Sequence, residues 1–305
     1  MRKFIVSLAV IFSVALAGYA QNERNVMWEP VNISSMDLYN GPGGTAMIPD
    51  LSRIEFLKEE TNGHNTKFRI KDGSGMIWVA KLGREAQPET AAVRLLHGIG
   101  YKTEINYLVP SITIPGKGTF QNVRLEARPD EFNRLEEWKW RQNPFLGTKE
   151  LRGLKMMMVF MTNWDVLDLQ NKVVDVGDEN QYIVSDLGAT FGKLGNNNFP
   201  IIYRFGRKTG SPKHFARTQL VRRVKDDGEV VLSYKGKNRG IFKGFTVEDA
   251  RWLHALLSQL SDKQIGDAFR AANYSPSDVT IYTEAVKRKI NELREAAASS
   301  NIAVK

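Results

Sequence analysis

The order of β-type and helical segments is the feature that most constrains this chain. Five β-type runs are separated mainly by turns rich in Gly and Asn, at residues 54–60, 66–72, 76–82, 105–114 and 120–127. One helical pattern, residues 87–100, lies between the third and the fourth run, and helical patterns dominate the second half of the chain. We therefore predict an α+β protein with two lobes. The N-terminal lobe is β-rich with one helix, and the C-terminal lobe is mostly helical.

The first 20 residues have the pattern of a secretory signal peptide. Arg2 and Lys3 form a basic start, residues 4–17 are apolar, and Gly18 and Ala20 are small residues placed before a cleavage site. The apolar run is shorter than the roughly 20 residues that a membrane-spanning helix needs, which argues against an anchor. We expect cleavage after Ala20, export to the periplasm or the medium, and no transmembrane segment in the mature chain.

Composition excludes several kinds of site. The chain has no Cys, which rules out disulfides, zinc–thiolate sites and cysteine nucleophiles. Its formal net charge of +9 suggests anionic partners, although a generally basic surface is equally compatible with that charge. No nucleic-acid-binding motif accompanies the charge, so no nucleic acid is expected as a partner. No G-x-S-x-G motif occurs, so a hydrolase of that type has no support.

Changes in composition and in the pattern of β-type and helical segments predict how the chain divides into parts. Residues 1–20 form the signal peptide, and the polar, turn-rich residues 21–50 form an N-terminal extension. The β-rich lobe is expected at 51–128 and the helical lobe at 129–305.

Three short motifs place charged side chains at the ends of predicted elements. The third β-type run ends in W-V-A-K with Lys81, and a Met-rich helix leads into T-N-W-D-V-L-D-L-Q-N, which contains Asp165 and Asn171. A short hairpin then ends in S-D-L-G with Asp186. Taken singly, Lys81 could be a solvated edge residue, Asp165 a helix-end residue and Asp186 a strand end. Their common order is the stronger signal, because one hairpin between them puts Asp165 and Asp186 on neighbouring loops.

These motifs resemble the V-A-I-K strand, the catalytic loop and the D-F-G element of protein kinases. The resemblance implies that Lys81 binds the nucleotide phosphates and pairs with Glu89 of the next helix, with Glu85 as the second choice. It implies that Asp165 takes the proton of the substrate hydroxyl. ATP would be the nucleotide, and its Mg²⁺ (or Mn²⁺) would be held by the residues Asp186 and Asn171.

The chain also departs from the conventional kinase pattern. Kinases space the catalytic Asp and the metal-binding Asn as D-x-x-x-x-N, which would place the Asn at Gln170, and Leu167 stands where many kinases carry a Lys. There is no G-x-G-x-x-G in the first turn and no A-P-E after D-L-G. The chain therefore resembles the atypical kinase-like group that includes the spore-coat kinase CotH, the HipA toxins, the Golgi secretory-pathway kinases and the phosphatidylinositol kinases.

A second resemblance covers more of the sequence. Over most of residues 54–285 the chain is similar to a family of secreted bacterial proteins. That family shares P-E-T-A-A-x-R-L, W-K-W-R-x-N-P-F, N-W-D and S-D-L-G-A-x-F-G.

Further contacts to a nucleotide follow from the kinase-like arrangement. The first turn has exposed backbone N–H groups that can cover the phosphates, at Gly63, Asn65 and Thr66, and Lys67 could assist them. The segment 126–128, which begins with Glu126, would be the hinge facing the adenine.

The expected function is that of an exported ATP- and metal-dependent phosphotransferase, and three points stay open. A catalytically inactive, pseudokinase-like binding or scaffold protein is the alternative, because Asn171 is displaced by one residue and ATP is scarce outside the cell. A nucleotidyl transferase would use the same residues. The basic tract 204–225 could hold an acidic substrate or a lipid headgroup, or be only a solvated loop.

Overall fold

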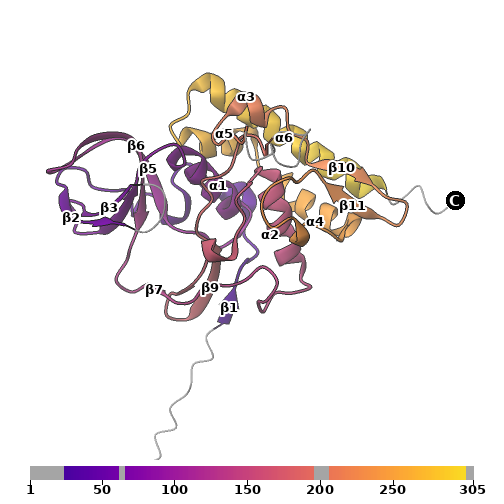
Figure 1. The fold of residues 1–305 in the computed structure, drawn as a ribbon, viewed down its shortest axis with the longest axis horizontal. Helices are drawn as coiled ribbons and strands as arrows, with labels where there is room; N and C mark the ends of the chain where they lie inside the picture. Colours follow the sequence, from indigo (N-terminus) through magenta and orange to yellow (C-terminus); the bar gives the residue numbers. More distant parts are fainter. Residues whose placement is uncertain (1–23, 62–65, 196–205, 300–305) are drawn as a thin grey trace, which may run out of the picture.

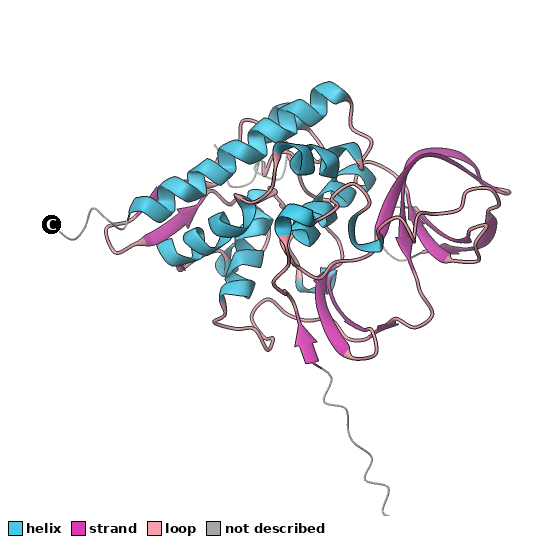
Figure 2. Ribbon diagram, turned by 180° about the vertical axis from the view of Figure 1, so that it is seen from behind, coloured by secondary structure: helices cyan, strands magenta, loops and turns pink. Residues whose placement is uncertain are grey.

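The structure, a computed structural model, describes residues 24–61, 66–195 and 206–299 and folds into two lobes (Figures 1 and 2). One lobe is a five-stranded sheet with a single helix, α1 (Ala86–Gly98), and the other is mostly helical. The strand order in the sheet is β2-β3-β4-β6-β5, and all of its pairs are antiparallel. Its strands are β2 (Glu55–Glu60), β3 (Lys67–Lys71), β4 (Ile77–Lys81), β5 (Asn106–Ile114) and β6 (Gly118–Ala127). The predicted α+β fold with two lobes is confirmed.

Alternation of side chains along β3 and β4 creates the core of the first lobe. Phe68 and Ile70 of β3 and Trp78 and Ala80 of β4 are buried together, because successive residues of a strand point to opposite faces. The indole N–H of Trp78 donates a hydrogen bond of 2.8 Å to Asp72, which satisfies the polar end of the ring. Helix α1 packs on β5 and β6, and its residues are almost all buried.

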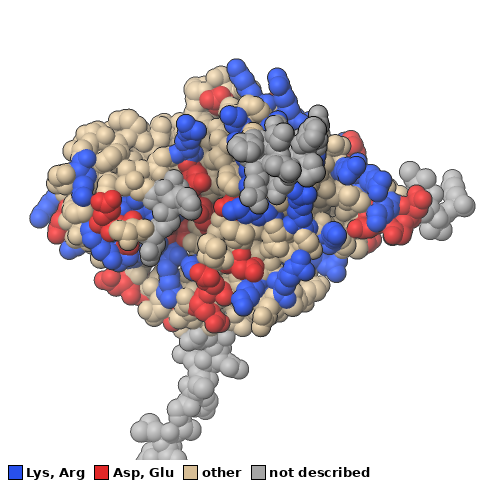
Figure 3. Space-filling view, viewed as in Figure 1, with Lys and Arg blue, Asp and Glu red and all other residues tan. Residues whose placement is uncertain are grey.

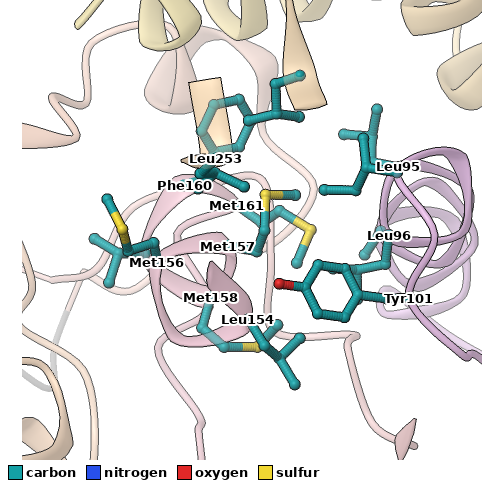
Figure 4. Packing of buried hydrophobic residues seen from close by; sticks show 14 of the residues in the cluster. Leu95, Leu96, Tyr101, Leu154, Met156, Met157, Met158, Phe160, Met161 and Leu253 are labelled. Carbon is teal, nitrogen blue, oxygen red and sulfur yellow. The ribbon is translucent and has the colours of Figure 1, made fainter. Parts of the chain in front are cut away.

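The second lobe is built around α2 (Lys149–Phe160), whose sequence predicted a core helix. Four methionines lie in this core, Met156, Met157, Met158 and Met161, and Figure 4 shows Met157 and Met161 between Leu253 and the α1 residues Leu95 and Leu96. The core is therefore continuous between α1 and the helical lobe. The other helices of this lobe are α3 (Pro212–Phe215), α4 (Val247–Leu257), α5 (Asp262–Arg270) and α6 (Pro276–Ala298).

Side-chain caps fix the starts of these helices. Thr148 accepts from the backbone N–H of Leu151 at the start of α2. Capping boxes open α4 and α5, through Thr246 with Asp249 and Ser261 with Gln264.

Two smaller sheets complete the fold. The first has the order β1-β9-β8-β7, and its hairpin β8–β9 is the one that the sequence predicts between Asp165 and Asp186. Its strands are β1 (Arg24–Val26), β7 (Asn133–Arg134), β8 (Asn171–Asp175) and β9 (Glu179–Val184). The second joins β10 (Val221–Val224), β11 (Glu229–Leu232) and β12 (Phe245–Thr246). Short 3₁₀ helices are η1 (Ile33–Ser35), η2 (Gly41–Gly43), η3 (Asp168–Gln170) and η4 (Arg239–Ile241).

The predicted N-terminal extension is built into the fold over its described part. Strand β1 pairs in parallel with β9, and Ile33 and Leu38 are buried in the main core. The side chain of Gln264 donates to the carbonyls of Ile33 (2.7 Å) and Met36 (3.0 Å), which ties this segment to α5. The predicted signal peptide lies outside the described residues. Among the described helices, none combines the length and the apolar character needed to cross a bilayer.

Lys289 of α6 is a buried lysine that forms no ion pair with a carboxylate in the described part of the chain. Its side chain is 0% exposed, its Nζ donates to the carbonyl of Phe160 at 2.9 Å, and it lies 4.6 Å from the centre of the Phe215 ring. Burial lowers the pKa of Lys289 to about 7. The unfolded chain therefore binds one more proton than the folded protein between about pH 7 and pH 10.4.

Lys289→Met is expected to change how stability depends on pH. Because the unfolded state holds the extra proton, this residue makes the wild-type protein more stable as pH rises, by about 1.4 kcal/mol per pH unit. Met has a similar volume and no charge, so the variant lacks this contribution. Urea unfolding from pH 7 to 10 should show the wild type gaining stability relative to Lys289→Met. The exposed Lys58→Met is the control, and curves for Lys289→Met and wild type that run parallel would contradict the assignment.

Candidate functional site

Lys81 lies at the centre of a group of carboxylates between the two lobes. Its side chain is buried, and its Nζ lies 3.0 Å from Oε2 of Glu89, 3.1 Å from Oε2 of Glu85 and 3.1 Å from Oδ1 of Asp186. The geometry follows from the sequence, because α1 begins directly after β4 and turns the Glu85 and Glu89 carboxylates toward the end of that strand. Three of the predicted site residues, Lys81, Glu89 and Asp186, are thus brought together, and Glu85 joins them.

The charges of Lys81 and Asp186 are fixed by their neighbours, whereas burial raises the pKa of Glu89 to about 7. Burial by itself lowers the pKa of Lys81, but the carboxylates of Glu89 and Asp186 outweigh it and hold the pKa well above its ordinary value. Burial opposes ionisation of Asp186, yet the Lys81 ammonium holds the pKa of Asp186 below its ordinary value. At neutral pH Lys81 is a cation and Asp186 an anion, the forms that phosphate and metal binding require.

Asp186 follows the end of β9 in a turn where Gly188 packs closely against Glu85. The backbone N–H of Gly188 donates to Oδ1 of Asp186 at 3.2 Å. A Cβ on Gly188 would lie 2.5 Å from Cβ of Glu85, so the D-L-G turn packs directly against the start of α1. The Asp186 side chain is 43% exposed, which leaves it accessible from the cleft.

Asp165 lies on the loop after α2 and is held from two sides. The side chain of Gln170 donates to Oδ2 of Asp165 at 3.1 Å, and Lys237 forms an ion pair with Oδ1. The backbone N–H of Asp165 donates to the buried side chain of Asn163 at 3.0 Å. Lys237 thus brings a cation to Asp165 from a distant segment, in a chain that has Leu167 where many kinases carry a Lys.

Asn171 is not in the cleft, in contrast to its predicted role as a metal ligand. It is the first residue of β8, is 0% exposed, and its amide donates to the carbonyl of Trp138 at 3.0 Å. Gln170, one residue earlier, lines the cleft with Asp186. Because neighbouring residues at the start of a strand face opposite ways, the displacement of one residue puts Asn171 inside the protein and Gln170 at the site.

The cleft between the lobes has a volume of about 500 Å³ and is lined mainly by charged residues. In Figure 3, acidic and basic side chains meet in the hollow between the two lobes. Lys67 of β3 lines the cleft, whereas Thr66 is exposed at the start of that strand and its carbonyl accepts from the N–H of Leu82 at 3.1 Å. Gly63 and Asn65, which were predicted to cover the phosphates, lie outside the described residues.

Arg124 of β6 forms the centre of a second, fully buried charge cluster. It lies opposite Lys81 in the strand pair β4–β6, and it contacts Glu89 at 3.2 Å, Glu104 at 3.3 Å and Glu126 at 2.8 Å. Glu89 therefore bridges the two cations, with Oε2 on Lys81 and Oε1 on Arg124. The cluster fixes the position of α1 relative to the sheet.

Glu126 lines the cleft, but its carboxylate is already engaged. It forms ion pairs with Arg124, Arg128 and Arg134. Glu126 was predicted to lie in a hinge that faces the adenine, and in the structure its carboxylate is instead paired with three guanidinium groups. Arg134 comes from β7, so this cluster also joins the two lobes.

The basic tract contributes to a hollow on the helical lobe. Its volume is about 610 Å³, and its described lining contains no carboxylate and five basic side chains, namely Lys193, His214, Arg217, Arg222 and Lys235. Figure 3 shows many basic side chains on this lobe. Arg204, the first residue of the tract, lies outside the described residues.

Several residues of the site have no strong signal in the sequence. Glu104, Arg134 and Lys237 reach the site from segments without a motif. Arg124 could have been noticed, because it is a charged residue between the apolar positions Val123 and Leu125 of a predicted strand. The kinase spacing already pointed to Gln170.

The residues of this site would bind Mg²⁺ only together with the phosphates of a nucleotide. Within residues 24–61, 66–195 and 206–299, no group of three His, Asp or Glu side chains is arranged to hold a metal ion by itself. Mg²⁺ is commonly held by one or two carboxylates together with the phosphates of a bound nucleotide and water. Asp186, accessible in the cleft and ionised, fits that requirement.

Four features together make up an atypical protein-kinase-like fold. They are the strand order of the five-stranded sheet, the single helix after its third strand in the chain, the Lys81–Glu89 pair, and the position of Asp165 and Asp186 on neighbouring loops. No family model matches the chain, and no curated protein matches it in sequence.

Among solved structures, the chain is similar to the proinflammatory kinase CtkA of Helicobacter pylori, with 11% identity, 84% of this chain and 99% of that chain covered, and a TM-score of 0.48. It is also similar to the Golgi casein kinase, with 9% identity, 84% and 76% coverage and a TM-score of 0.42. A structure of the Golgi casein kinase with Mn/ADP bound gives 10% identity, 84% and 75% coverage and a TM-score of 0.36. These similarities are distant, and the roles of individual residues rest on the contacts described above.

Proposed function

We propose that the protein is an atypical kinase-like phosphotransferase that uses ATP and a divalent metal ion. One observation carries the proposal. Lys81, buried and paired with Glu89 of α1, lies 3.1 Å from Asp186, which comes from the other lobe. A Lys at a strand end that served only stability would need a single carboxylate partner. Lys81 instead has partners from both lobes, and we infer that the phosphates and the metal ion bind beside it.

Different residues of the cleft bind different parts of the nucleotide and its metal ion. Lys81 binds the phosphates and is kept in place by Glu89. Asp186 holds the metal ion, and Gln170 is the second metal ligand, the role that the sequence suggested for Asn171. Mg²⁺ or Mn²⁺, when bound, neutralises the charge of the phosphates. Val79 and Leu169 are the apolar residues of the cleft that can contact a base.

Asp165 is the residue that would receive the acceptor hydroxyl. A positioned carboxylate there can orient the hydroxyl and take its proton. Gln170 and Lys237 hold this carboxylate in place. The hollow lined by Lys193, His214, Arg217, Arg222 and Lys235 would attract an acidic substrate or a lipid headgroup, because it carries no carboxylate. Export with cleavage after Ala20 stays a prediction.

A pseudokinase-like binding protein is the second candidate. It is favoured by the position of Asn171, which is buried away from the cleft, and by the ion-pair cluster around Glu126 at the expected base site. Retention of Lys81 and Asp186 in one cleft, with Asp165 hydrogen-bonded to the cleft residue Gln170, favours the enzyme, as does the cation that Lys237 brings to Asp165.

ATP labelled at different phosphates separates the candidates. We expect label from the γ-phosphate, and not from the α-phosphate, to be transferred to water or to the protein itself when Mg²⁺ or Mn²⁺ is present. Transfer of the α-label would identify a nucleotidyl transferase instead. Binding of ATP without transfer of either label would favour the pseudokinase, and the variant Asp165→Asn provides the background rate.

A further inference from the structure

A second hollow lies next to the cleft, and we call it the rear cavity. It has a volume of about 270 Å³ and is bounded by the N-terminal segment, the connection after α1, the residues after β6 and the hairpin β8–β9. Of the residues that the structure describes, only Glu126, Arg128 and Arg134 line both the rear cavity and the cleft. Their ion pairs therefore form the partition between the two spaces.

Most of the rear cavity has an apolar wall. The wall is contributed by every bounding segment, through Val31, Met36, Ile105, Phe132, Val174 and Ile183. His97 adds no charge at neutral pH, because burial lowers the pKa of His97 to about 4. This partly open space is slightly smaller than the roughly 300–1,000 Å³ of typical small-molecule sites, so it suits a small ligand.

The carboxylates at the polar end of the rear cavity are already saturated. Glu126 is shared by three guanidinium groups. Glu104 accepts from Arg124, from Arg134 and from the hydroxyl of Ser185 at 2.6 Å. A cationic ligand would therefore have to compete with existing ion pairs for either carboxylate.

Arg128 still has hydrogen-bond donors that can bind a ligand. Its hydrogen bonds to the described residues all run through Nη1, to Glu126 and to the carbonyl of Ala127 at 3.4 Å. Its Nε and Nη2 make none with the described part of the chain. Three carboxylates, those of Glu89, Glu104 and Glu126, serve the guanidinium groups of Arg124, Arg128 and Arg134, and Arg128 is paired with Glu126 alone. A planar guanidinium edge binds a carboxylate through two parallel hydrogen bonds.

We propose that the rear cavity binds a small amphipathic carboxylate, with the carboxylate on Arg128 and the apolar body against the wall formed by Ile105, Phe132 and Ile183. The site goes beyond the proposed phosphotransferase function and does not depend on it, since the ligand would bind without any nucleotide.

Octanoate and octan-1-ol provide a matched pair of probes, because they differ in the charged end and share the apolar chain. Calorimetric titration of the full mature chain should show one octanoate bound per protein, at least tenfold more tightly than octan-1-ol, which corresponds to about 1.4 kcal/mol. Arg128→Gln should remove this preference. Because Arg128 also lines the cleft, Val31→Trp is the second variant. Val31 is 37% exposed and lines the rear cavity only, so Trp should weaken octanoate binding at least tenfold without disturbing a packed core.

The exposed Leu51→Trp is the control for adding an indole, and it should bind octanoate like the wild type. Mg²⁺ with ATP should leave octanoate bound. The proposal is overturned if octan-1-ol binds as tightly as octanoate, if Val31→Trp has no effect, if ATP displaces octanoate, or if octanoate does not bind at millimolar concentration. None of these outcomes bears on whether the cleft transfers phosphate.

Discussion

Asp165→Asn is expected to lower the rate of phosphoryl transfer by about 100- to 10,000-fold, the range that a positioned general base contributes. The substitution keeps the size of the side chain, and its amide oxygen can still accept the hydrogen bond from Gln170. It removes the negative charge that orients the acceptor hydroxyl and accepts its proton. Affinity for ATP should remain nearly unchanged, because Lys81 and Asp186 bind the phosphates and the metal. Initial rates and nucleotide titrations on the same preparation measure both quantities.

Asp168→Asn is the matched control for this experiment. Asp168 lies three residues further along the same loop, and its Oδ1 accepts from the backbone N–H of Trp140 at 2.9 Å, which an amide oxygen can also do. This control should keep its activity. Loss of activity in Asp168→Asn together with full activity in Asp165→Asn would show that the wrong carboxylate has been assigned.

Arg124→Met is expected to destabilise the protein by about 3–5 kcal/mol, the usual cost of removing one partner from a buried ion-pair cluster. Met fills much of the same space, but Glu89, Glu104 and Glu126 lose a guanidinium that lies 2.8–3.3 Å from each of them. At about 2–4 °C per kcal/mol, the loss corresponds to a fall in Tm of roughly 6–20 °C. Thermal and urea unfolding measure it.

Two further variants test the origin of that loss. Adding Glu104→Gln to Arg124→Met should recover part of the stability, because one of the three buried carboxylates that lost Arg124 is then neutral. The exposed Arg251→Met should cost less than about 1 kcal/mol, as is usual for surface ion pairs. A loss below about 1 kcal/mol for Arg124→Met itself would mean that the cluster is not the link between α1 and the sheet.

The parts that could be predicted from the sequence depend on local patterns. Five β-type runs with one helix after the third gave the sheet and α1, because alternation and turn residues act within a few residues of each other. Lys81 and Glu89 could be paired because a strand end and the helix start that follows it lie close in sequence. Asp186 was found in the same way, at a strand end followed by Gly188.

The rest of the site depends on contacts that no local pattern carries. Lys237 and Glu104 reach Asp165 and Arg124 from distant segments, and their residue types are ordinary for loops. Asn171 was assigned one residue away from the position that faces the cleft, because the start of β8 decides which side chain points inward. The N-terminal segment was expected to be an extension because its composition is polar and turn-rich. That composition does not indicate that Ile33 and Leu38 are buried in the core.

Metal-dependent stabilisation by ATP tests the central claim most directly. If Asp186 holds the metal ion and Lys81 the phosphates, ATP should raise the Tm of the mature protein only when Mg²⁺ or Mn²⁺ is present. At a ligand concentration of about 100 times Kd the gain is about 2.7 kcal/mol, or several degrees in Tm. Asp186→Asn should lose the metal-dependent part of the shift. No shift with any pair of nucleotide and metal, or an equal shift in Asp186→Asn, would contradict the account.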